Sequence, residues 1–245
     1  MKVNTIYNES CLDTLKKMKD ESVDCIVTSP PYNKSYWSKN QNINNGFKTK
    51  SRNISYGDFE DNIEPQKYID EQKIIINECL RVLKENGSMF YNHIDILNNH
   101  TTIHPSYIYE FPLKQIIVWN RKNTPKLDAS YFYPVTEYIF WLKKHKNSKP
   151  LFYRKNAQFK TNVWEFQADT KNEHPAPFPI KLAANCIIST TNEGDLIYDP
   201  YMGSGTTAVA SAMYNRNYIG SELHESYIKM ANKRLEPIFS QTKLL

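Results

Sequence analysis

Long apolar runs are missing from the 245-residue sequence, and none approaches the ~20 residues that a membrane-spanning helix requires. The N-terminal sequence MKVNTIYNES also lacks the apolar core of a signal peptide. Cysteines are few and far apart, with no CxxC pair, which argues against a disulfide framework or a cysteine zinc site. We therefore expect a globular protein with reduced thiols, located in the cytoplasm and without a membrane partner.

The excess of one charge over the other is small, with 31 Lys and Arg against 26 Asp and Glu and a formal net charge of +5. This mildly basic balance permits a polyanionic partner without proving one. Hydrophobic residues make up 40% of the chain and charged residues 23%, a globular composition that excludes disorder along most of its length. With no internal repeat or low-complexity tract, we expect a single domain over residues 1–245.

Short apolar segments alternate with helical patterns along most of the chain. Strands are expected over residues 3–7, 23–27, 88–91, 116–119, 136–142, 196–198 and 218–220. Helices are expected after a cap at residues 8–10, over 66–83 with a stop at 86–87, and over 180–188, 207–213 and 225–235. This alternation predicts an α/β fold with a largely parallel sheet.

Glycines follow the expected strand 196–198, in the sequence DPYMGSGTT of residues 199–207. At a strand-to-helix junction, glycines let the backbone approach a ligand closely. Glu222, near the end of the next strand, can hold both hydroxyls of a ribose, so the two features together indicate a nucleoside-containing cofactor. The loop lacks the lysine of a P-loop, and Val209 and Ala210 break a GxGxxG fingerprint. A merely structural turn is the alternative.

A second candidate site follows the strand 23–27, in the sequence Ser29-Pro30-Pro31-Tyr32. Two prolines stiffen this turn and leave its carbonyls free to accept hydrogen bonds. The Ser29 oxygen and an adjacent carbonyl can together bind an NH₂ group, and Tyr32 offers a flat face on which a ring can stack. A purely structural turn is again the alternative.

In this order, the motifs resemble those of the amino-group DNA methyltransferases that use S-adenosyl-L-methionine, in the group whose catalytic motif precedes the cofactor loop. Residues 27–32, VTSPPY, are similar to the catalytic motif, and residues 199–207 to the DP[FY]xGSGTT cofactor loop. Residues 174–179, HPAPFP, are similar to the HPAxFP segment before this loop, and Glu222 to the ribose-binding acid. One departure is Ser10, which stands where members often carry an acid.

The resemblance implies a circularly permuted Rossmann-like methyltransferase fold, with a mostly parallel sheet and helices on both faces. In that fold both motifs end neighbouring parallel strands, which brings Tyr32 and Gly203 to one edge of the sheet. The hydroxyl of Ser10 or the carboxylate of Glu9 is expected to replace the missing acid. The residues implied to bind S-adenosyl-L-methionine are Ser10, Cys11, Thr28, His174, Pro175, Phe178, Asp199, Tyr201, Met202, Gly203, Ser204, Gly205, Thr206 and Glu222.

The resemblance also implies the catalytic residues, which are Ser29, Pro30, Pro31 and Tyr32. An exocyclic amine is a poor nucleophile because its lone pair is conjugated with the ring. Acceptance of both N–H bonds by Ser29 and the Pro30 carbonyl would aim that lone pair at the methyl donor. The base must flip out of the duplex and stack on Tyr32. The chemistry needs no metal, and no metal site is expected at the histidines His93, His100 and His104.

A serine at the start of the catalytic motif, together with HPAxFP, is similar to the N4-cytosine enzymes, so cytosine N4 is the favoured target and adenine N6 the alternative. Cytosine C5 methylation is disfavoured because no cysteine follows a proline. A catalytically idle nucleic-acid-binding module is a further alternative. RNA or protein amide methyltransferases fit less well because of the motif order, and nucleotide hydrolases because no phosphate-binding lysine is present.

Two basic segments are candidates for contacting DNA. Residues 33–58 are expected to form a mobile loop after the catalytic turn, and residues 143–173 a small target-recognition insertion. The residues expected to touch DNA are Lys34, Tyr36, Trp37, Lys39, Lys48, Lys50, Arg52, Lys143, Lys144 and Arg154. The expected partner is double-stranded DNA, in a bacterial, archaeal or phage-infected cell. A cognate restriction enzyme and the choice between monomer and homodimer are left open.

Overall fold

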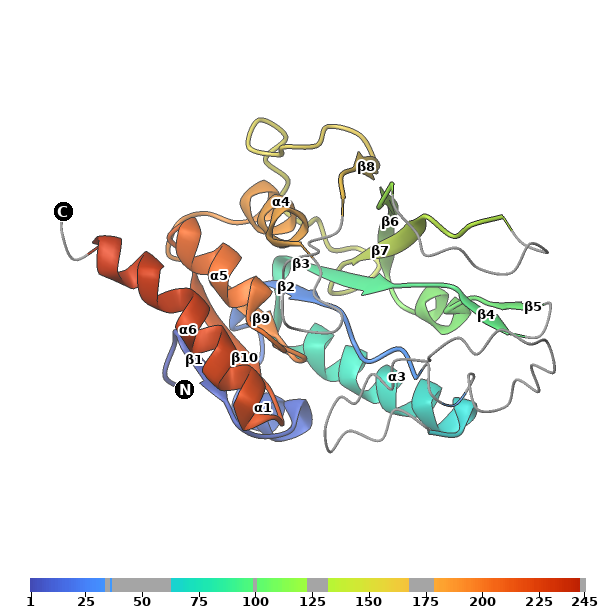
Figure 1. Cartoon of the computed structure of the whole chain (residues 1–245), viewed down its shortest axis with the longest axis horizontal. Coiled ribbons are helices and arrows are strands. Elements are labelled where there is room, and N and C mark those ends of the chain that lie inside the picture. The colour runs from blue at the N-terminus through green and yellow to red at the C-terminus, as the bar shows by residue number, and fades with distance from the viewer. Residues whose placement is uncertain (34–35, 37–62, 99–100, 123–131, 168–178, 243–245) are drawn as a thin grey trace, which may run out of the picture.

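The computed structural model describes residues 1–33, 36, 63–98, 101–122, 132–167 and 179–242 (Figure 1). An eight-stranded sheet runs through the molecule, and a separate hairpin joins β4 (Ile96–Asn98) to β5 (Thr101–Ile103). Across the sheet the strands are β1 (Thr5–Tyr7), β10 (Asn217–Ser221), β9 (Leu196–Asp199), β2 (Val23–Thr28), β3 (Leu83–His93), β7 (Thr136–Leu142), β6 (Leu113–Asn120) and β8 (Val163–Glu165). None of the helices in these ranges has the length and apolarity that a bilayer crossing demands.

Most neighbouring strands run in the same direction. The five strands from β1 to β3 in this order pair in parallel. β7 is antiparallel to both of its neighbours, β3 and β6, and β8 pairs in parallel with β6. The sheet is therefore mixed but mostly parallel, which confirms the predicted α/β class.

Helices cover both faces of the sheet (Figure 1). One face carries α1 (Cys11–Lys17), α3 (Pro65–Val82) and the 3-10 helix η1 (Ser106–Glu110), and the other carries α4 (Ile180–Thr190), α5 (Thr206–Met213) and α6 (Glu225–Thr242). Side chains along β7 alternate between the two layers: Phe140 and Leu142 pack into the cluster with α3, whereas Ile139 and Trp141 pack into the cluster with α4. Both faces of the central strands are thus buried, as a parallel sheet requires.

Both motif-bearing strands end at the same edge of the sheet. β2 and β9 are parallel neighbours, with Cys25 beside Ile197 and Ile26 beside Tyr198. Because parallel neighbours place their carboxyl ends together, the turn after β2 and the loop after β9 leave from one edge, called the carboxyl edge below. This arrangement confirms the expectation that the two motifs meet.

The junction between α3 and β3 differs from the expectation. The helix ends at Val82 and β3 begins immediately, so residues 86–87 lie inside a strand instead of ending the helix. The register between β2 and β3 shifts from Val23–Leu83 to Cys25–Ser88, which shows that a bulge absorbs the intervening residues. Glycine is required in this bulge, because a Cβ on Gly87 would lie 2.9 Å from the Asp24 carbonyl oxygen.

The last helix is longer than its sequence pattern indicates. α6 continues to Thr242, although Pro237 lies inside it and the expected end was at residue 235. Leu235 is 2% exposed, and both it and Ile238 pack against the cluster around Tyr218. This apolar contact offsets the backbone hydrogen bond that the proline removes. The three-residue strands β4, β5 and β8 and the helix η1 were not expected, because they are too short to show a period.

Candidate active site

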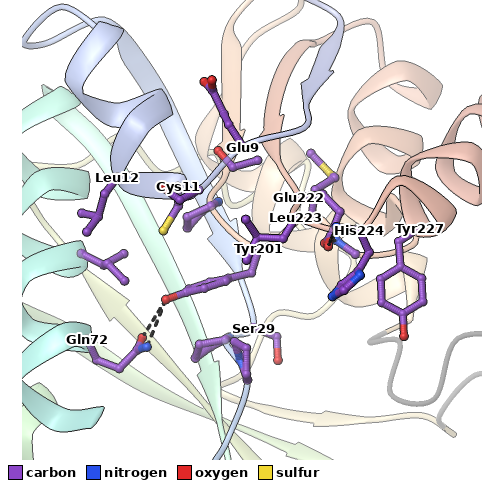
Figure 2. Close-up of a pocket in the computed structure, with 18 of the residues that line it drawn as sticks. Glu9, Cys11, Leu12, Ser29, Gln72, Tyr201, Glu222, Leu223, His224 and Tyr227 are labelled. Atoms are coloured by element: carbon purple, nitrogen blue, oxygen red, sulfur yellow. Dashed lines mark hydrogen bonds between the residues drawn. The ribbon is translucent and has the colours of Figure 1, made fainter. Parts of the chain in front are cut away.

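A cavity of about 300 Å³ opens at the carboxyl edge (Figure 2). Its wall combines the start of α1, the turn after β2, one face of α3, residues 200–204 and 206 after β9, and residues 221–224 and 227 at the end of β10 and beyond it. Such a volume is at the lower end of the range for small-molecule sites. The sequence-predicted residues that line it are Ser10, Cys11, Ser29, Pro30, Pro31, Tyr32, Tyr201, Met202, Gly203, Ser204, Thr206 and Glu222. One cavity therefore contains both motifs.

Asp199, at the end of β9, holds the loop of residues 200–205 from behind. Its buried carboxylate accepts hydrogen bonds from Tyr201 N at 3.0 Å and from Thr207 Oγ1 at 2.6 Å. Burial raises the pKa of Asp199 to about 6, because the charged form is poorly solvated there. Neither Asp199 nor the buried Thr28 lines the cavity, so these two predicted cofactor residues lie behind its wall.

The loop bends through two glycines, and α6 packs directly against it. Gly203 and Gly205 have φ angles of 51° and 83°, in the left-handed region that favours glycine. A Cβ on Gly205 would lie 2.5 Å from the Cβ of Ala231 on α6, so Gly205 faces the helix and does not line the cavity. Arg234 of α6 donates to the Ser204 carbonyl at 2.6 Å and to Ser204 Oγ at 3.0 Å. The arginine was missed from sequence because only the fold brings α6 to this loop.

Glu222 leaves β10 where this glycine loop passes. Its Oε2 accepts a hydrogen bond from Gly203 N at 2.8 Å, and its Oε1 accepts one from His224 N at 2.9 Å. These bonds fix the carboxylate, and each oxygen keeps a lone pair that can accept from a vicinal hydroxyl. Leu223, His224 and Tyr227 line the same end of the cavity. Among the residues described, no three His, Cys, Asp or Glu side chains gather as a metal site requires.

The turn after β2, called the diproline corner below (residues 29–32), presents Ser29 to the cavity. Ser29 Oγ lies 2.6 Å from the hydroxyl oxygen of Tyr32. Tyr32 is 6% exposed, and its ring centroid lies 4.8 Å from that of His93. Tyr68 of α3 donates a hydrogen bond to the Pro31 carbonyl at 2.9 Å. The corner is therefore anchored to α3 in addition to being stiffened by its prolines.

Gln72 of α3, which sequence reasoning missed, links the helix to the loop after β9 and to β3. Its Nε2 donates to the Tyr201 hydroxyl at 3.0 Å (Figure 2), and its Oε1 accepts from the Tyr91 hydroxyl at 2.9 Å. Burial raises the pKa of both tyrosines well above its ordinary value, so both stay protonated. The available signal was a glutamine on the apolar face of the helix, between Ile69 and Ile76.

The start of α1 borders the cavity, but its polar side chains make their hydrogen bonds and ion pair with residues of the helix. Ser10 caps α1, because its Oγ accepts from Asp13 N at 3.2 Å and donates to Asp13 Oδ2 at 2.8 Å. The Glu9 carboxylate accepts from Thr14 Oγ1 at 2.9 Å and pairs with Lys17. Figure 2 shows this carboxylate turned away from the diproline corner. Both residues line the cavity, so the replacement of the missing acid by Ser10 or Glu9 stays a prediction.

The loop expected to contact DNA begins beside the cavity. Asn33 has a φ of 55°, and its side chain donates to Ile63 O at 2.7 Å and accepts from Ile63 N at 2.8 Å. Asn33 and Ile63, which flank residues 34–62, are thus held together at the carboxyl edge. Tyr36 is half-buried. The predicted residues that lie outside the described ranges are Lys34, Trp37, Lys39, Lys48, Lys50, Arg52, His174, Pro175 and Phe178.

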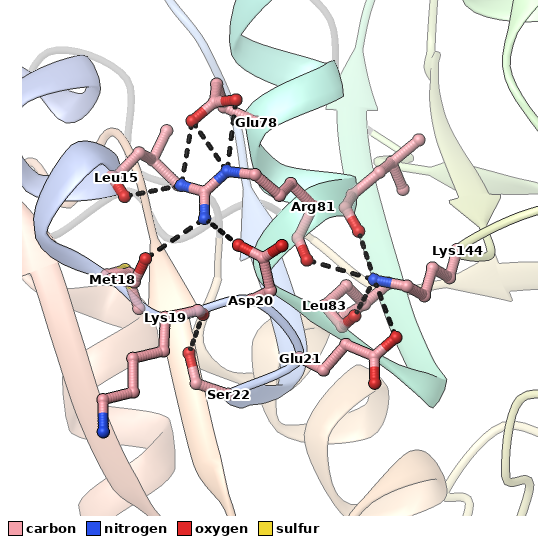
Figure 3. A network of polar contacts seen from close by, with 11 residues as sticks. Leu15, Met18, Lys19, Asp20, Glu21, Ser22, Glu78, Arg81, Leu83 and Lys144 are labelled. Carbon is pink, nitrogen blue, oxygen red and sulfur yellow. Dashed lines mark hydrogen bonds and ion pairs between the residues drawn. The ribbon is translucent and has the colours of Figure 1, made fainter.

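Lys144 has a structural role, which corrects its assignment as a DNA contact (Figure 3). Its Nζ donates to the carbonyl oxygens of Leu80, Arg81 and Leu83 at 3.1, 3.0 and 2.7 Å. It also lies 3.5 Å from a carboxylate oxygen of Glu21. The cation therefore binds carbonyls at the end of α3 and interacts favourably with the helix dipole.

Lys143 and Arg154 also lie far from the cavity, at the opposite edge of the sheet. β7 is antiparallel to β3, so the chain emerges there after Leu142. Tyr153 N donates to Ser189 O at 2.7 Å, which holds Arg154 beside the end of α4 at the same edge. Residues 143–155 therefore lie at the edge of the sheet opposite to the cavity, and the assignment of Lys143 and Arg154 as DNA contacts stays a prediction.

Comparisons with known proteins agree with this geometry. The model of the DNA methylase family N6_N4_Mtase matches residues 23–233. The type II methyltransferase M2.MboI of Moraxella bovis is 28% identical over 251 residues, covering 95% of this chain and 88% of that protein. The DNA adenine methyltransferase YhdJ of Escherichia coli (strain K12) is 29% identical over 265 residues, covering 95% and 82%.

Solved structures share the fold. The chain superposes on the PvuII DNA methyltransferase (cytosine-N4-specific) with a TM-score of 0.72 and 19% identity, covering 96% of this chain and 90% of that one. It superposes on M1.HpyAVI, solved as a SAM complex, with a TM-score of 0.64 and 23% identity, covering 94% and 98%. These similarities match the mostly parallel sheet with helices on both faces.

Proposed function

The chain belongs to the DNA methylase family N6_N4_Mtase, and we propose that it methylates cytosine at N4 in double-stranded DNA, with adenine N6 as the second candidate. Like its family, it is an S-adenosyl-L-methionine-dependent DNA amino-methyltransferase. The single observation that carries the proposal is the shared cavity, in which Ser29 and Pro30 face the same space as Gly203 and Glu222.

The residues around this cavity fit S-adenosyl-L-methionine. Glu222 keeps lone pairs for both ribose hydroxyls, and the left-handed Gly203 offers a backbone surface without a Cβ. Met202 and Tyr201 add apolar surface to the same wall. When bound, S-adenosyl-L-methionine supplies an electrophilic sulfonium methyl group.

The diproline corner supplies orientation. Ser29 Oγ and the Pro30 carbonyl would accept the two N–H bonds of the target amine, which directs its lone pair toward the methyl group. A held near-attack geometry contributes roughly 7–11 kcal/mol. Flipping the base costs a few kcal/mol, of which stacking on Tyr32 would return roughly 1–3 kcal/mol. Because Tyr68 and the prolines hold the corner, little reorganisation is needed when the base arrives.

The choice of base rests on Ser29, since the resemblance associates a serine at this position with cytosine N4. Adenine N6 is the second candidate because the relative YhdJ is named a DNA adenine methyltransferase. Both bases present an exocyclic amine beside a ring nitrogen, so both satisfy the acceptors of the corner. The type II names of relatives such as M2.MboI further support a role beside a cognate restriction enzyme.

The test is to incubate the protein with double-stranded DNA and methyl-labelled S-adenosyl-L-methionine, digest the DNA to nucleosides and identify the labelled one. N4-methyl-2′-deoxycytidine is expected, and N6-methyl-2′-deoxyadenosine would establish the second candidate instead. Absence of label with every DNA tested would contradict the proposal. Calorimetric titration with S-adenosyl-L-methionine then distinguishes an idle nucleic-acid-binding module, in which no cofactor binds.

A further inference from the structure

A chain of hydrogen bonds, called the relay below, runs along the carboxyl edge to the catalytic serine from Arg121 through Glu137, Asn92 and Tyr32. Arg121 Nη1 lies 3.2 Å from Glu137 Oε1. Asn92 Nδ2 donates to Glu137 Oε2 at 2.7 Å and to the Tyr32 hydroxyl at 2.8 Å. The Tyr32 hydroxyl lies 2.6 Å from Ser29 Oγ. Four strands contribute to it, since Arg121 follows β6, Glu137 lies near the start of β7, Asn92 lies near the end of β3, and the diproline corner follows β2.

The relay is buried, and two of its polar atoms, Asn92 Oδ1 and Arg121 Nε, have no hydrogen-bond partner among the described residues. Glu137 is 9% exposed and Asn92 is 2% exposed. A buried carboxylate is costly unless it is paired, and Arg121 supplies that pairing. The carbonyl oxygen Oδ1 of Asn92 is buried without a hydrogen-bond partner among the described residues. The orientation of this amide is therefore dictated by Glu137 and not by the satisfaction of its own acceptor.

The charge on Glu137 sets the orientation of the Asn92 amide. A carboxylate paired with Arg121 can only accept, so the amide nitrogen of Asn92 must face it. The second hydrogen of that nitrogen points at Tyr32, whose oxygen must accept it. While its oxygen accepts from Asn92, the Tyr32 hydroxyl can donate its own hydrogen to Ser29 Oγ, 2.6 Å away, although this distance alone fits either direction. In that direction Ser29 accepts the hydrogen bond and therefore keeps its own hydrogen and one lone pair for the cavity.

We propose that Glu137 and Asn92 are positioning residues that make Ser29 a hydrogen-bond donor to the ring nitrogen beside the target amine. This inference rests on the proposed function. The remaining lone pair of Ser29 still accepts an N–H from the amine. Cytosine N3 and adenine N1 are both acceptors next to the amine, so either target satisfies the donor. In a base that carries hydrogen on this ring nitrogen, two hydrogen-bond donors would face each other, and the base would be rejected.

The substitution Glu137→Gln reverses the relay with almost no change in shape. Arg121 only donates, so the new amide must turn its oxygen to Arg121 and its nitrogen to Asn92. Asn92 must then present Oδ1, which accepts from Tyr32. The Tyr32 oxygen in turn accepts the Ser29 hydrogen. Ser29 keeps its acceptor capacity but loses the hydrogen that it would donate to the base.

The experiment pairs this variant with a substrate that lacks the ring nitrogen. Duplex DNA carries either the normal target or its analogue with C–H at that position, 3-deaza-2′-deoxycytidine or 1-deaza-2′-deoxyadenosine according to the base methylated. kcat/KM is measured on both for wild type and for Glu137→Gln. The matched control is Glu165→Gln, which removes an exposed carboxylate at the end of β8 that pairs with Lys122. The intrinsic reactivity of the analogue cancels when the ratios of two proteins are compared.

With wild type and the control, the analogue is expected to lower kcat/KM by about 3- to 10-fold, the loss of one hydrogen bond. Glu137→Gln lowers kcat/KM on normal DNA by a similar factor and shows no further loss with the analogue. If the loss from Glu137→Gln and the loss from the analogue were independent, the two factors would multiply in the variant assayed on the analogue. That result would overturn the proposal and leave Glu137 a purely structural residue. If circular dichroism shows that Glu137→Gln does not fold, Asn92→Ala is used instead, because it removes the relay residue next to Tyr32. The fold loss of kcat/KM caused by the analogue must then be smaller than in wild type. Failure of wild type to methylate any DNA would instead refute the proposed function.

Discussion

Substitution of Gly205 by alanine tests the packing of α6 against the glycine loop. Gly205 has a φ of 83°, and an added Cβ would lie 2.5 Å from the Cβ and 3.0 Å from the Cα of Ala231. The Cα belongs to the backbone of a helix and cannot move aside as a side-chain tip can. Either α6 must shift or the loop must, and the loop forms the wall on which the cofactor is proposed to bind.

The loss of unfolding free energy in Gly205→Ala has two parts, and a second glycine of the chain allows them to be separated. A left-handed alanine costs roughly 1–2 kcal/mol. Overpacking adds roughly 1–3 kcal/mol. Gly194 has the same φ of 83° with nothing within 4 Å of its Cβ position, so Gly194→Ala carries only the first part. The difference between the two variants isolates the contact with Ala231.

Urea unfolding at pH 7 measures this difference, and titration with S-adenosyl-L-methionine measures the functional consequence. Gly205→Ala is expected to be less stable than Gly194→Ala by about 1–3 kcal/mol. It should also bind the cofactor more weakly, whereas Gly194→Ala should bind as wild type does. Equal unfolding free energies for the two variants would refute the packing argument.

Three further predictions concern single side chains. Glu222→Ala removes the acceptor of Gly203 N and the proposed ribose contact, so cofactor affinity measured by calorimetry should fall at least about tenfold, and an unchanged affinity would contradict the contact. The pKa of Asp199 is about 6 in the folded state, against an ordinary 3.8. Between these pH values the folded state binds more protons than the unfolded state, so the free energy of unfolding falls by about 3 kcal/mol as the pH rises from 3.8 to 6. Asp199→Asn should abolish this decline in urea unfolding from pH 4 to 7, and an unaltered decline would show that another group causes it. Lys144→Met should lower the free energy of unfolding by about 2–3 kcal/mol, because a charged donor to three carbonyls is lost. It should leave DNA affinity unchanged. The control is Lys146→Met, at an exposed position. Reduced DNA affinity of folded Lys144→Met would restore its assignment as a DNA contact.

The meeting of the two motifs could be predicted from sequence because each motif directly follows a strand. Ser29 comes after an apolar run that ends in prolines, and Gly203 lies between a strand and a helix. Strands of this kind, joined by helices, pair in parallel and align their carboxyl ends. The pairing of β2 with β9 in particular was implied by the family resemblance, because these strands lie far apart in the sequence. Glu222 was placed by the same reasoning, one strand further along.

The failures concern side chains whose partners are distant in sequence. Lys144 belongs to a basic run that is typical of a solvated surface, and only the antiparallel pairing of β7 with β3 brings it to the end of α3. Glu137 and Asn92 have no local pattern that distinguishes them from other polar residues at strand ends. Their relationship appears only when the strands are assembled, since 45 residues separate them.

The most direct test of the account compares Ser29→Ala with wild type in two assays on the same preparation. Ser29 is proposed to bind the target amine, and residues 200–204 with Glu222 are proposed to bind the cofactor, within one cavity. Methyl transfer to DNA should therefore fall below detection, while the Kd for S-adenosyl-L-methionine remains that of wild type. Retained methyl transfer, or an equal loss of transfer and of cofactor binding in a folded variant, would contradict that division of roles.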